Sequence, residues 1–293
     1  MSLPALAYSG FAKIASNLLQ LRPNEIVIPE EYNDTTNRRR RKVAIVTGSN
    51  TGVGYETAKR LVKEYNMDVI IACRNVEKGI QTCQSINTDN GNGGSGGGMA
   101  VFVRPLDLTN FDSVRQFAKA VNEQYDSIDV LVNNAGRNSA GDVLPITINN
   151  NNATTTTTNN TDNNILSLDV IFTTNFLGHF LLTNLLLEKC KRVVNLSSVM
   201  HHFPKYSKQN DAYDDINSVE YWKHMATTIM PTPTPSPTEP ISSSTKSKTV
   251  VQRKTYGPSK LAALLFSVEL NRRYNNKENG GGMVSIAVNP GSV

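Results

Sequence analysis

The chain has 293 residues, of which 39% are hydrophobic and 19% are charged, so it can bury a sizeable core and is not a wholly disordered protein. Its formal net charge of +5 is concentrated in one basic run at residues 38–42, which argues against an extended basic face for nucleic acid. Three scattered cysteines are too few for a disulfide framework or a zinc site, so we expect a cytoplasmic protein without a metal.

The first 42 residues are expected to form an extension that precedes the folded domain. Residues 1–22 contain no acidic side chain, and four apolar residues recur there at helical spacing: Phe11, Ile14, Leu18 and Leu21. Such a segment could be a transit peptide, could make peripheral contact with a membrane, or could pack on the domain, and these alternatives stay open. We interpret the basic run at 38–42 as a solvated linker, with a nuclear signal or a phosphate-binding arm as the alternative.

From residue 43 onward, short apolar runs alternate with amphipathic helical segments such as residues 111–125. Six strands are expected, at residues 43–46, 69–72, 100–103, 128–132, 192–196 and 284–288. This alternation predicts βαβ units around a parallel sheet with helices on both faces. We therefore expect an α/β fold with a Rossmann-type, doubly wound parallel sheet in three α/β/α layers, forming one domain over residues 43–293.

Three low-complexity insertions interrupt this pattern, near residues 88–98, 149–164 and 231–250. They are rich in Asn, Gly, Thr, Ser and Pro, so we expect them to be disordered or weakly ordered. A further segment between residues 203 and 255 carries Tyr213, Tyr221 and Trp222, which predict a lid over the site.

A glycine-rich turn at residues 47–54 follows the first expected strand and opens the first expected helix. In this context glycines let the backbone approach a pyrophosphate, which the helix N-terminal N–H groups can bind. The spacing is Gly-x-x-x-Gly-x-Gly rather than Gly-x-Gly-x-x-Gly. The turn predicts a nucleotide site at Gly48, Ser49, Asn50, Thr51, Gly52, Val53 and Gly54.

Six further motifs follow in order, each near the end of an expected strand or on an expected helix. They are Asp107-Leu108, Asn133-Asn134-Ala135-Gly136, Asn175, Ser198, Tyr256-x-x-x-Lys260 and Asn289-Pro290-Gly291. Together with the turn they resemble the short-chain dehydrogenase/reductase family. The segments at 72–75, 175–182 and 197–202 resemble its retinol dehydrogenase-like branch, which is also similar to WW-domain oxidoreductases and protochlorophyllide reductases.

The resemblance assigns roles to these motifs. It implies that Asp107 and Leu108 contact the adenine. It also implies that the cofactor is lined by Asn134, Ala135, Gly136, Tyr256, Lys260, Pro290 and Gly291. It implies a catalytic set of four residues: Asn175, Ser198, Tyr256 and Lys260. Asn175 would hold a water of the proton relay, Ser198 would bind the substrate oxygen, and Tyr256 would be the general acid and base.

The Tyr256 and Lys260 spacing agrees with carbonyl reduction on physical grounds. The reaction needs a proton donor near the oxygen as hydride arrives, and an ordinary tyrosine, with a pKa near 10, needs a neighbouring cation to serve at neutral pH. Lys260 lies four residues after Tyr256, so both lie on one helix face, and the lysine can also reach the nicotinamide ribose.

Arg74 indicates the cofactor. In open dinucleotide-binding sheets an acidic residue at the end of the second strand binds the ribose hydroxyl of NAD, whereas an arginine accommodates the 2′-phosphate of NADP. The second expected strand ends in Ala72-Cys73-Arg74 without an acid, which favours NADP(H), with a loop-capping role for Arg74 as the alternative. Cys73 is interpreted as a small strand-end residue rather than a redox thiol.

The sequence thus predicts an NADP(H)-dependent oxidoreductase that interconverts an apolar alcohol and its aldehyde or ketone. The alternative is a nucleotide-binding fragment or redox-sensing module without turnover. The chain stops at Val293, where members of the family usually continue, so we expect a truncated product whose sixth strand is an exposed sheet edge. A homodimer through the helices after Asp169 and Tyr256 stays open. His179 and His202 lack partners spaced for a metal site, so structural roles are expected for both.

Overall fold

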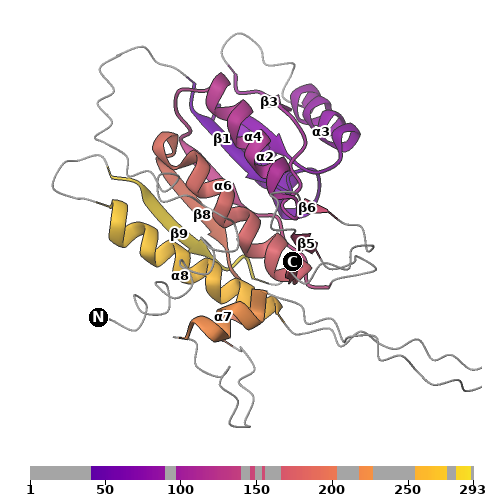
Figure 1. The fold of residues 1–293 in the computed structure, drawn as a ribbon. Helices are drawn as coiled ribbons and strands as arrows, with labels where there is room; N and C mark the ends of the chain where they lie inside the picture. Colours follow the sequence, from indigo (N-terminus) through magenta and orange to yellow (C-terminus); the bar gives the residue numbers. More distant parts are fainter. Residues whose placement is uncertain are drawn as a thin grey trace, which may run out of the picture.

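The computed structural model describes residues 41–89, 97–139, 168–202, 218–226, 255–275 and 282–291, and the backbone of 146–148, 154–155 and 166–167. Six parallel strands form the main sheet (Figure 1): β1 (Val43–Thr47), β2 (Asp68–Ala72), β3 (Ala100–Val101), β4 (Val130–Asn133), β8 (Arg192–Leu196) and β9 (Val284–Val288). Their order is β3-β2-β1-β4-β8-β9, which is the doubly wound arrangement. The predicted fold class is confirmed.

Helices cover both faces of the sheet, because the strands are apolar on both sides. Along β1, Val43 and Ile45 belong to one buried cluster, whereas Ala44 and Val46 belong to another. The first cluster also holds side chains of α4 (Phe111–Gln124), α6 (Gly178–Leu186) and α8 (Tyr256–Tyr274). The second holds side chains of α2 (Gly52–Lys63) and α3 (Val76–Asp89).

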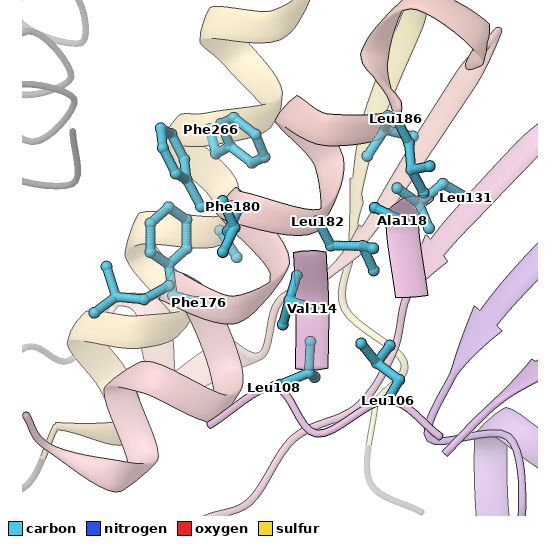
Figure 2. Packing of buried hydrophobic residues seen from close by; sticks show 14 of the residues in the cluster. Leu106, Leu108, Val114, Ala118, Leu131, Phe176, Phe180, Leu182, Leu186 and Phe266 are labelled. Carbon is cyan, nitrogen blue, oxygen red and sulfur yellow. The ribbon is translucent and has the colours of Figure 1, made fainter. Parts of the chain in front are cut away.

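The central helical segment runs from Val170 to Lys189 as four consecutive pieces. These are α5 (Val170–Phe172), the π-helix η2 (Thr173–Leu177), α6 and the 3-10 turn η3 (Leu187–Lys189). Within the described residues it is the one helix long and apolar enough to cross a membrane, and 89% of its most apolar window is buried. Figure 2 shows why: Phe176 and Phe180 lie beside Phe266 of α8, and Leu182 lies toward Val114 of α4.

One edge of the sheet differs from the sequence prediction and the other agrees with it. The third strand ends at Val101, and Asn87 of α3 pins it by side-chain hydrogen bonds of 2.8 and 2.9 Å to the N–H and carbonyl of Ala100. At the other edge lies β9, as predicted for the sixth strand, and its Ile286 and Val288 side chains are exposed.

A small antiparallel sheet was not predicted. It consists of β5 (Ile146–Ile148) between β6 (Thr154–Thr155) and β7 (Leu166–Leu168). Within the insertion at 149–164, two β-branched residues, Thr154 and Thr155, pair with β5. Residues 90–96 and 231–250, and the extension at 1–40, lie outside the described residues, so the predictions made for them are not addressed by the structure.

The predicted lid is wrong at Tyr221 and Trp222. Both lie on α7 (Val219–Ala226), where they are 3% and 0% exposed and join the core. The Trp222 ring lies 6.3 Å from that of Phe172, so the aromatic residues help to seat the central helical segment rather than cover a site. Tyr213 lies outside the described residues.

Within the basic run, the Arg41 side chain contacts residues of the folded domain. Its guanidinium donates to the Gly97 carbonyl at 2.7 Å and lies 3.3 Å from a carboxylate oxygen of Asp68. Residues 38–40 lie outside the described residues.

Candidate active site

The predicted site residues lie at one edge of the sheet. All six strands of the main sheet are parallel, so their carboxyl ends lie at the same edge. The predicted site segments follow these ends. The chain direction across the sheet reverses between β1 and β4, and open α/β sheets bind ligands in the crevice at that point. The structure thus brings the predicted segments to the place where a dinucleotide would lie.

The glycine-rich turn packs tightly against the segment after β4. A Cβ added to Gly54 would lie 2.4 Å from Asn134 Nδ2 and 2.5 Å from the Gly48 carbonyl oxygen. Gly48 adopts a φ of 65°, and its Cβ would lie 3.0 Å from Ala135 Cα. Asn134 Nδ2 also donates to the Thr47 carbonyl at 2.7 Å. Both glycines are therefore required by close backbone packing.

Gly52 and the start of α2 face open space instead. Gly52 has a φ of 57°, and a Cβ there would meet nothing within 4 Å. The N-cap residue Thr51 makes no side-chain capping hydrogen bond, and the first turn carries no acidic residue. The helix therefore starts with N–H groups that can bind an anion, as the pyrophosphate prediction requires. Asn50 and Val53, also in the turn, are half-buried.

Two predicted contact residues turn their side chains inward. Ser49 Oγ donates to the Val46 carbonyl at 2.7 Å and accepts the Ala72 N–H at 3.2 Å, so it holds the turn to β2. Leu108 is buried in the core beside α6, as Figure 2 shows. Their direct contribution to a cofactor site is therefore limited to the backbone.

The ends of β2 and β3 place Arg74 and Asp107 at this edge. Arg74 is exposed and follows Cys73, whose carbonyl accepts the Leu106 N–H at 3.0 Å. Asp107 Oδ1 accepts hydrogen bonds from the N–H and hydroxyl of Thr109. Burial raises the pKa of the Cys73 thiol, which agrees with a packing role rather than a reactive thiolate.

Asn175 is the most fully hydrogen-bonded of the predicted catalytic residues. Its Oδ1 accepts the Arg137 N–H at 2.8 Å, and its Nδ2 donates to the Arg137 carbonyl at 2.9 Å and to Ser259 Oγ at 3.0 Å. It lies in the π-helix η2, where the Gly178 N–H reaches back to the Thr173 carbonyl. Single π-helical turns of this kind occur frequently at functional sites.

Lys260 lies beside Asn175 and Tyr256. A Cβ on Gly136 would lie 3.4 Å from both Lys260 Nζ and Asn175 Oδ1, and Nζ lies 5.6 Å from the centre of the Tyr256 ring. Lys260 is 5% exposed, and burial lowers the pKa of its ammonium to about 8. Within the described residues one of its three donors is used, to the Leu196 carbonyl at 2.9 Å, so two can serve a ligand.

Of two adjacent serines, only Ser198 is available to a substrate. Ser197 is buried and donates to the Lys260 carbonyl at 2.9 Å. Ser198 is half-buried, and its Oγ accepts the Met200 N–H at 3.3 Å, which leaves its own proton to donate. The Ser198 carbonyl contacts His201 Nδ1.

The start of α8 is anchored by residues that sequence reasoning missed. Asp169 Oδ1 accepts from Thr255 Oγ1 at 2.8 Å and from the Phe172 N–H at 2.7 Å. This contact fixes the residue before Tyr256 relative to the central helical segment. Asp169 and Thr255 are 86 positions apart, so no local sequence signal links them.

The segment after β9 completes this edge. The Ser197 N–H donates to the Val288 carbonyl at 2.8 Å, which continues the pairing of the last two strands. Pro290 and Gly291 are exposed just beyond, and Gly291 has a φ of 81°. In the described part of the chain, no group of three or more His, Cys, Asp or Glu residues could hold a metal ion.

His179 lies fully buried beneath the site, in agreement with the structural role predicted for it. Its Nε2 lies 2.9 Å from Thr47 Oγ1, and its Nδ1 lies 3.1 Å from the Asn175 carbonyl oxygen. Burial and, to a smaller extent, the Lys260 charge lower the pKa of the imidazole to about 4, against the opposing effect of the hydrogen bond to the Asn175 carbonyl. The ring is therefore neutral near pH 7.

This lowered pKa predicts acid sensitivity. Between about pH 6.5 and pH 4 the unfolded chain binds a proton at His179 and the folded chain does not, so stability falls as the pH falls through this window. We expect the free energy of unfolding to drop by about 2 kcal/mol between pH 7 and pH 5 from this residue alone. Urea titrations of the wild type and His179→Asn at both pH values test it; an equal drop in both proteins would contradict the assignment.

The sheet order and the groups gathered at its switch point define an α/β fold of the dinucleotide-binding class. The family profile for short chain dehydrogenase matches residues 42–210, and the chain belongs to this family, whose members bind nicotinamide dinucleotides. The resemblance to its retinol dehydrogenase-like branch is also confirmed.

Named relatives agree with this. The chain is 33% identical over 257 residues to retinol dehydrogenase 11 of Homo sapiens, covering 86% of this chain and 61% of that protein. It is 32% identical to retinol dehydrogenase 13 of Homo sapiens, covering 85% and 58%. Polyprenol dehydrogenase of Danio rerio is 35% identical, covering 55% and 44%. The chain thus spans about three fifths of the length of the first relatives.

Solved structures support the fold alone. A short chain dehydrogenase from Salmonella enterica superposes with a TM-score of 0.52 at 18% identity, covering 86% of this chain and 76% of that one. An alcohol dehydrogenase from the archaeon Thermococcus sibiricus, complexed with 5-hydroxy-NADP, gives 0.50 at 17% identity, covering 87% and 77%.

Proposed function

We propose that this protein is an NADP(H)-dependent oxidoreductase that interconverts an apolar alcohol and its aldehyde or ketone. The observation that carries the proposal is the buried Lys260 ammonium, which lies beside Tyr256 and Asn175 at the switch point of the sheet. A buried cation with unused donors is costly unless a ligand or a reaction uses it.

The arrangement of side chains supports a division of roles. Tyr256 donates a proton to the carbonyl oxygen during reduction and accepts it during oxidation. Lys260 favours the phenolate form of that tyrosine by its charge, and the Ser198 hydroxyl donates a hydrogen bond to the same oxygen. Asn175, with its side chain held by Arg137 and Ser259, orients the water that returns the proton.

The residues present fit a nicotinamide dinucleotide. The uncapped start of α2 and the open space at Gly52 fit a pyrophosphate, and the missing Cβ of Gly136 leaves room beside Lys260 Nζ. When bound, the nicotinamide supplies or accepts the hydride. The bound dinucleotide would be lined by Asn134, Ala135, Pro290 and Gly291, and its adenine would be contacted by Asp107.

An apolar substrate is supported by the relatives. Two of them are named for retinol and for polyprenol, both apolar alcohols. The test is turnover of a panel of apolar aldehydes and ketones by the full chain with NADPH, with hydrophilic carbonyl compounds as controls. Turnover of the hydrophilic compounds alone would contradict the substrate class, and nucleotide binding without turnover would favour a sensing module.

Arg74 should decide between the two nucleotides. We expect Arg74→Ala to weaken NADPH binding by about 10- to 100-fold and to leave NADH binding within about 3-fold, because a charge-assisted contact to the 2′-phosphate is lost. Fluorescence titration with both nucleotides measures this. Arg60→Ala, an exposed position on the last turn of α2, is the control. Equal weakening of both nucleotides would overturn NADP(H) preference.

A further inference from the structure

His179 connects three segments of the site. Through Nδ1 it contacts the Asn175 carbonyl in the π-helix, and through Nε2 it contacts Thr47 at the end of β1. Thr47 Oγ1 in turn accepts the N–H groups of Asn134 and Ala135 at 2.9 and 3.0 Å. One imidazole therefore links the π-helix η2, which carries Asn175, to the start of the glycine-rich turn and, through Thr47, to the segment after β4.

The direction of each hydrogen bond follows from the chemistry of the partners. The Asn175 carbonyl can only accept, so Nδ1 carries the proton. The ring is neutral, because burial and the nearby Lys260 charge both disfavour a second proton, so Nε2 is bare and accepts the Thr47 hydroxyl proton. The other acceptor in reach of that hydroxyl, the Val132 carbonyl, lies farther away, at 3.3 Å. The lone pairs of Thr47 Oγ1 are thereby turned toward the two backbone N–H groups.

We propose that His179 is a positioning residue that couples the nucleotide-binding turn to the Asn175 carbonyl, and that each ring nitrogen serves one side of this coupling. The proposal rests on the oxidoreductase function proposed above. Nε2 orients Thr47, which holds Asn134 and Ala135 against Gly48, so its loss should weaken nucleotide binding. Nδ1 fixes the Asn175 peptide beside Lys260, so its loss should lower the turnover rate.

Two half-replacements separate these roles. Asn places an amide near the position of Nδ1 and cannot reach Thr47, whereas Gln places one near Nε2 and leaves the Asn175 carbonyl without a donor. We expect His179→Asn to raise KM for NADPH about 10-fold with kcat within about 3-fold of wild type. We expect His179→Gln to lower kcat about 10-fold with KM for NADPH within about 3-fold of wild type. His179→Leu should show both losses, and His224→Asn on α7 is the control for a His to Asn change elsewhere.

Measurements without turnover keep the proposal independent of the enzyme assay. Nitrogen NMR of labelled histidine should show the Nδ1–H tautomer of His179 between pH 8 and pH 5. The Arg137 N–H, which donates to Asn175 Oδ1, should exchange about 10-fold faster in His179→Gln than in wild type and stay unchanged in His179→Asn.

The outcomes are distinguishable. Observation of the Nε2–H tautomer would overturn the coupling. The same holds if kcat and nucleotide affinity fall together in all three variants, in proportion to the drop in melting temperature, because His179 would then be a packing residue only. If the wild-type chain binds no nicotinamide nucleotide, the proposed function fails, while the tautomer and the exchange of the Arg137 N–H still decide the positioning role.

Discussion

Replacing Tyr256 with Phe is expected to lower carbonyl reduction by about 10²- to 10⁴-fold while NADPH affinity stays within about 3-fold of wild type. The change removes one hydroxyl, the proton donor of the proposed reaction, and keeps the half-buried ring that lies 5.6 Å from Lys260 Nζ. Helix α8 and its Asp169 anchor are left in place, since that anchor is made by Thr255. Single-turnover reduction of an apolar aldehyde with excess NADPH measures the chemical step directly.

Tyr65→Phe is the matched control, because Tyr65 lies at the surface, 66% exposed, beyond the last turn of α2. It should leave the single-turnover rate unchanged. A rate for Tyr256→Phe within about 3-fold of wild type would show that another group supplies the proton, and the catalytic assignment would be wrong. Lost nucleotide binding in the same variant would instead place Tyr256 in the cofactor site alone.

Much of the sheet edge could be predicted because its signals are local. Short apolar runs alternate with helical segments, which predicts a doubly wound parallel sheet. In such a sheet the carboxyl ends of the strands lie at one edge, so the polar and glycine-rich segments that follow them lie close together. Gly48 and Gly54 follow β1 directly, and Lys260 follows Tyr256 by one helical turn. Each of these relations lies within a few residues of the chain, so the spacing itself carries the information.

The contacts that hold the site together could not be predicted in this way. Thr47 and His179 are 132 positions apart, and Asn175 meets Ser259 across 84. Such pairs depend on how β1, the central helical segment and α8 pack, which no spacing rule supplies. The prediction of a lid at Trp222 was wrong for the same reason. An aromatic residue between low-complexity stretches is typical of a lid, and its packing against Phe172 is not visible in the sequence.

Replacing two glycines of the glycine-rich turn, one at a time, should separate an effect on folding from an effect on nucleotide binding. We expect Gly54→Ala to lower the free energy of unfolding by about 3 kcal/mol, because its Cβ would lie 2.5 Å from the Gly48 carbonyl oxygen, which is backbone and has no rotamer to change. The other close atom, Asn134 Nδ2, donates to the Thr47 carbonyl, so moving it breaks a second contact. Urea unfolding measures the loss, and NADPH binding should be lost with it.

Gly52→Ala should behave differently. A Cβ there meets nothing within 4 Å, so the only cost to the fold is a left-handed φ of 57°, about 1 to 2 kcal/mol. Because that open space is where the pyrophosphate is proposed to lie, we expect NADPH affinity to fall by about 10-fold or more in a chain that remains folded. Unchanged affinity in folded Gly52→Ala would show that the pyrophosphate does not lie at this turn. Equal destabilisation by both changes would instead contradict the packing against Gly48 and Asn134 described above.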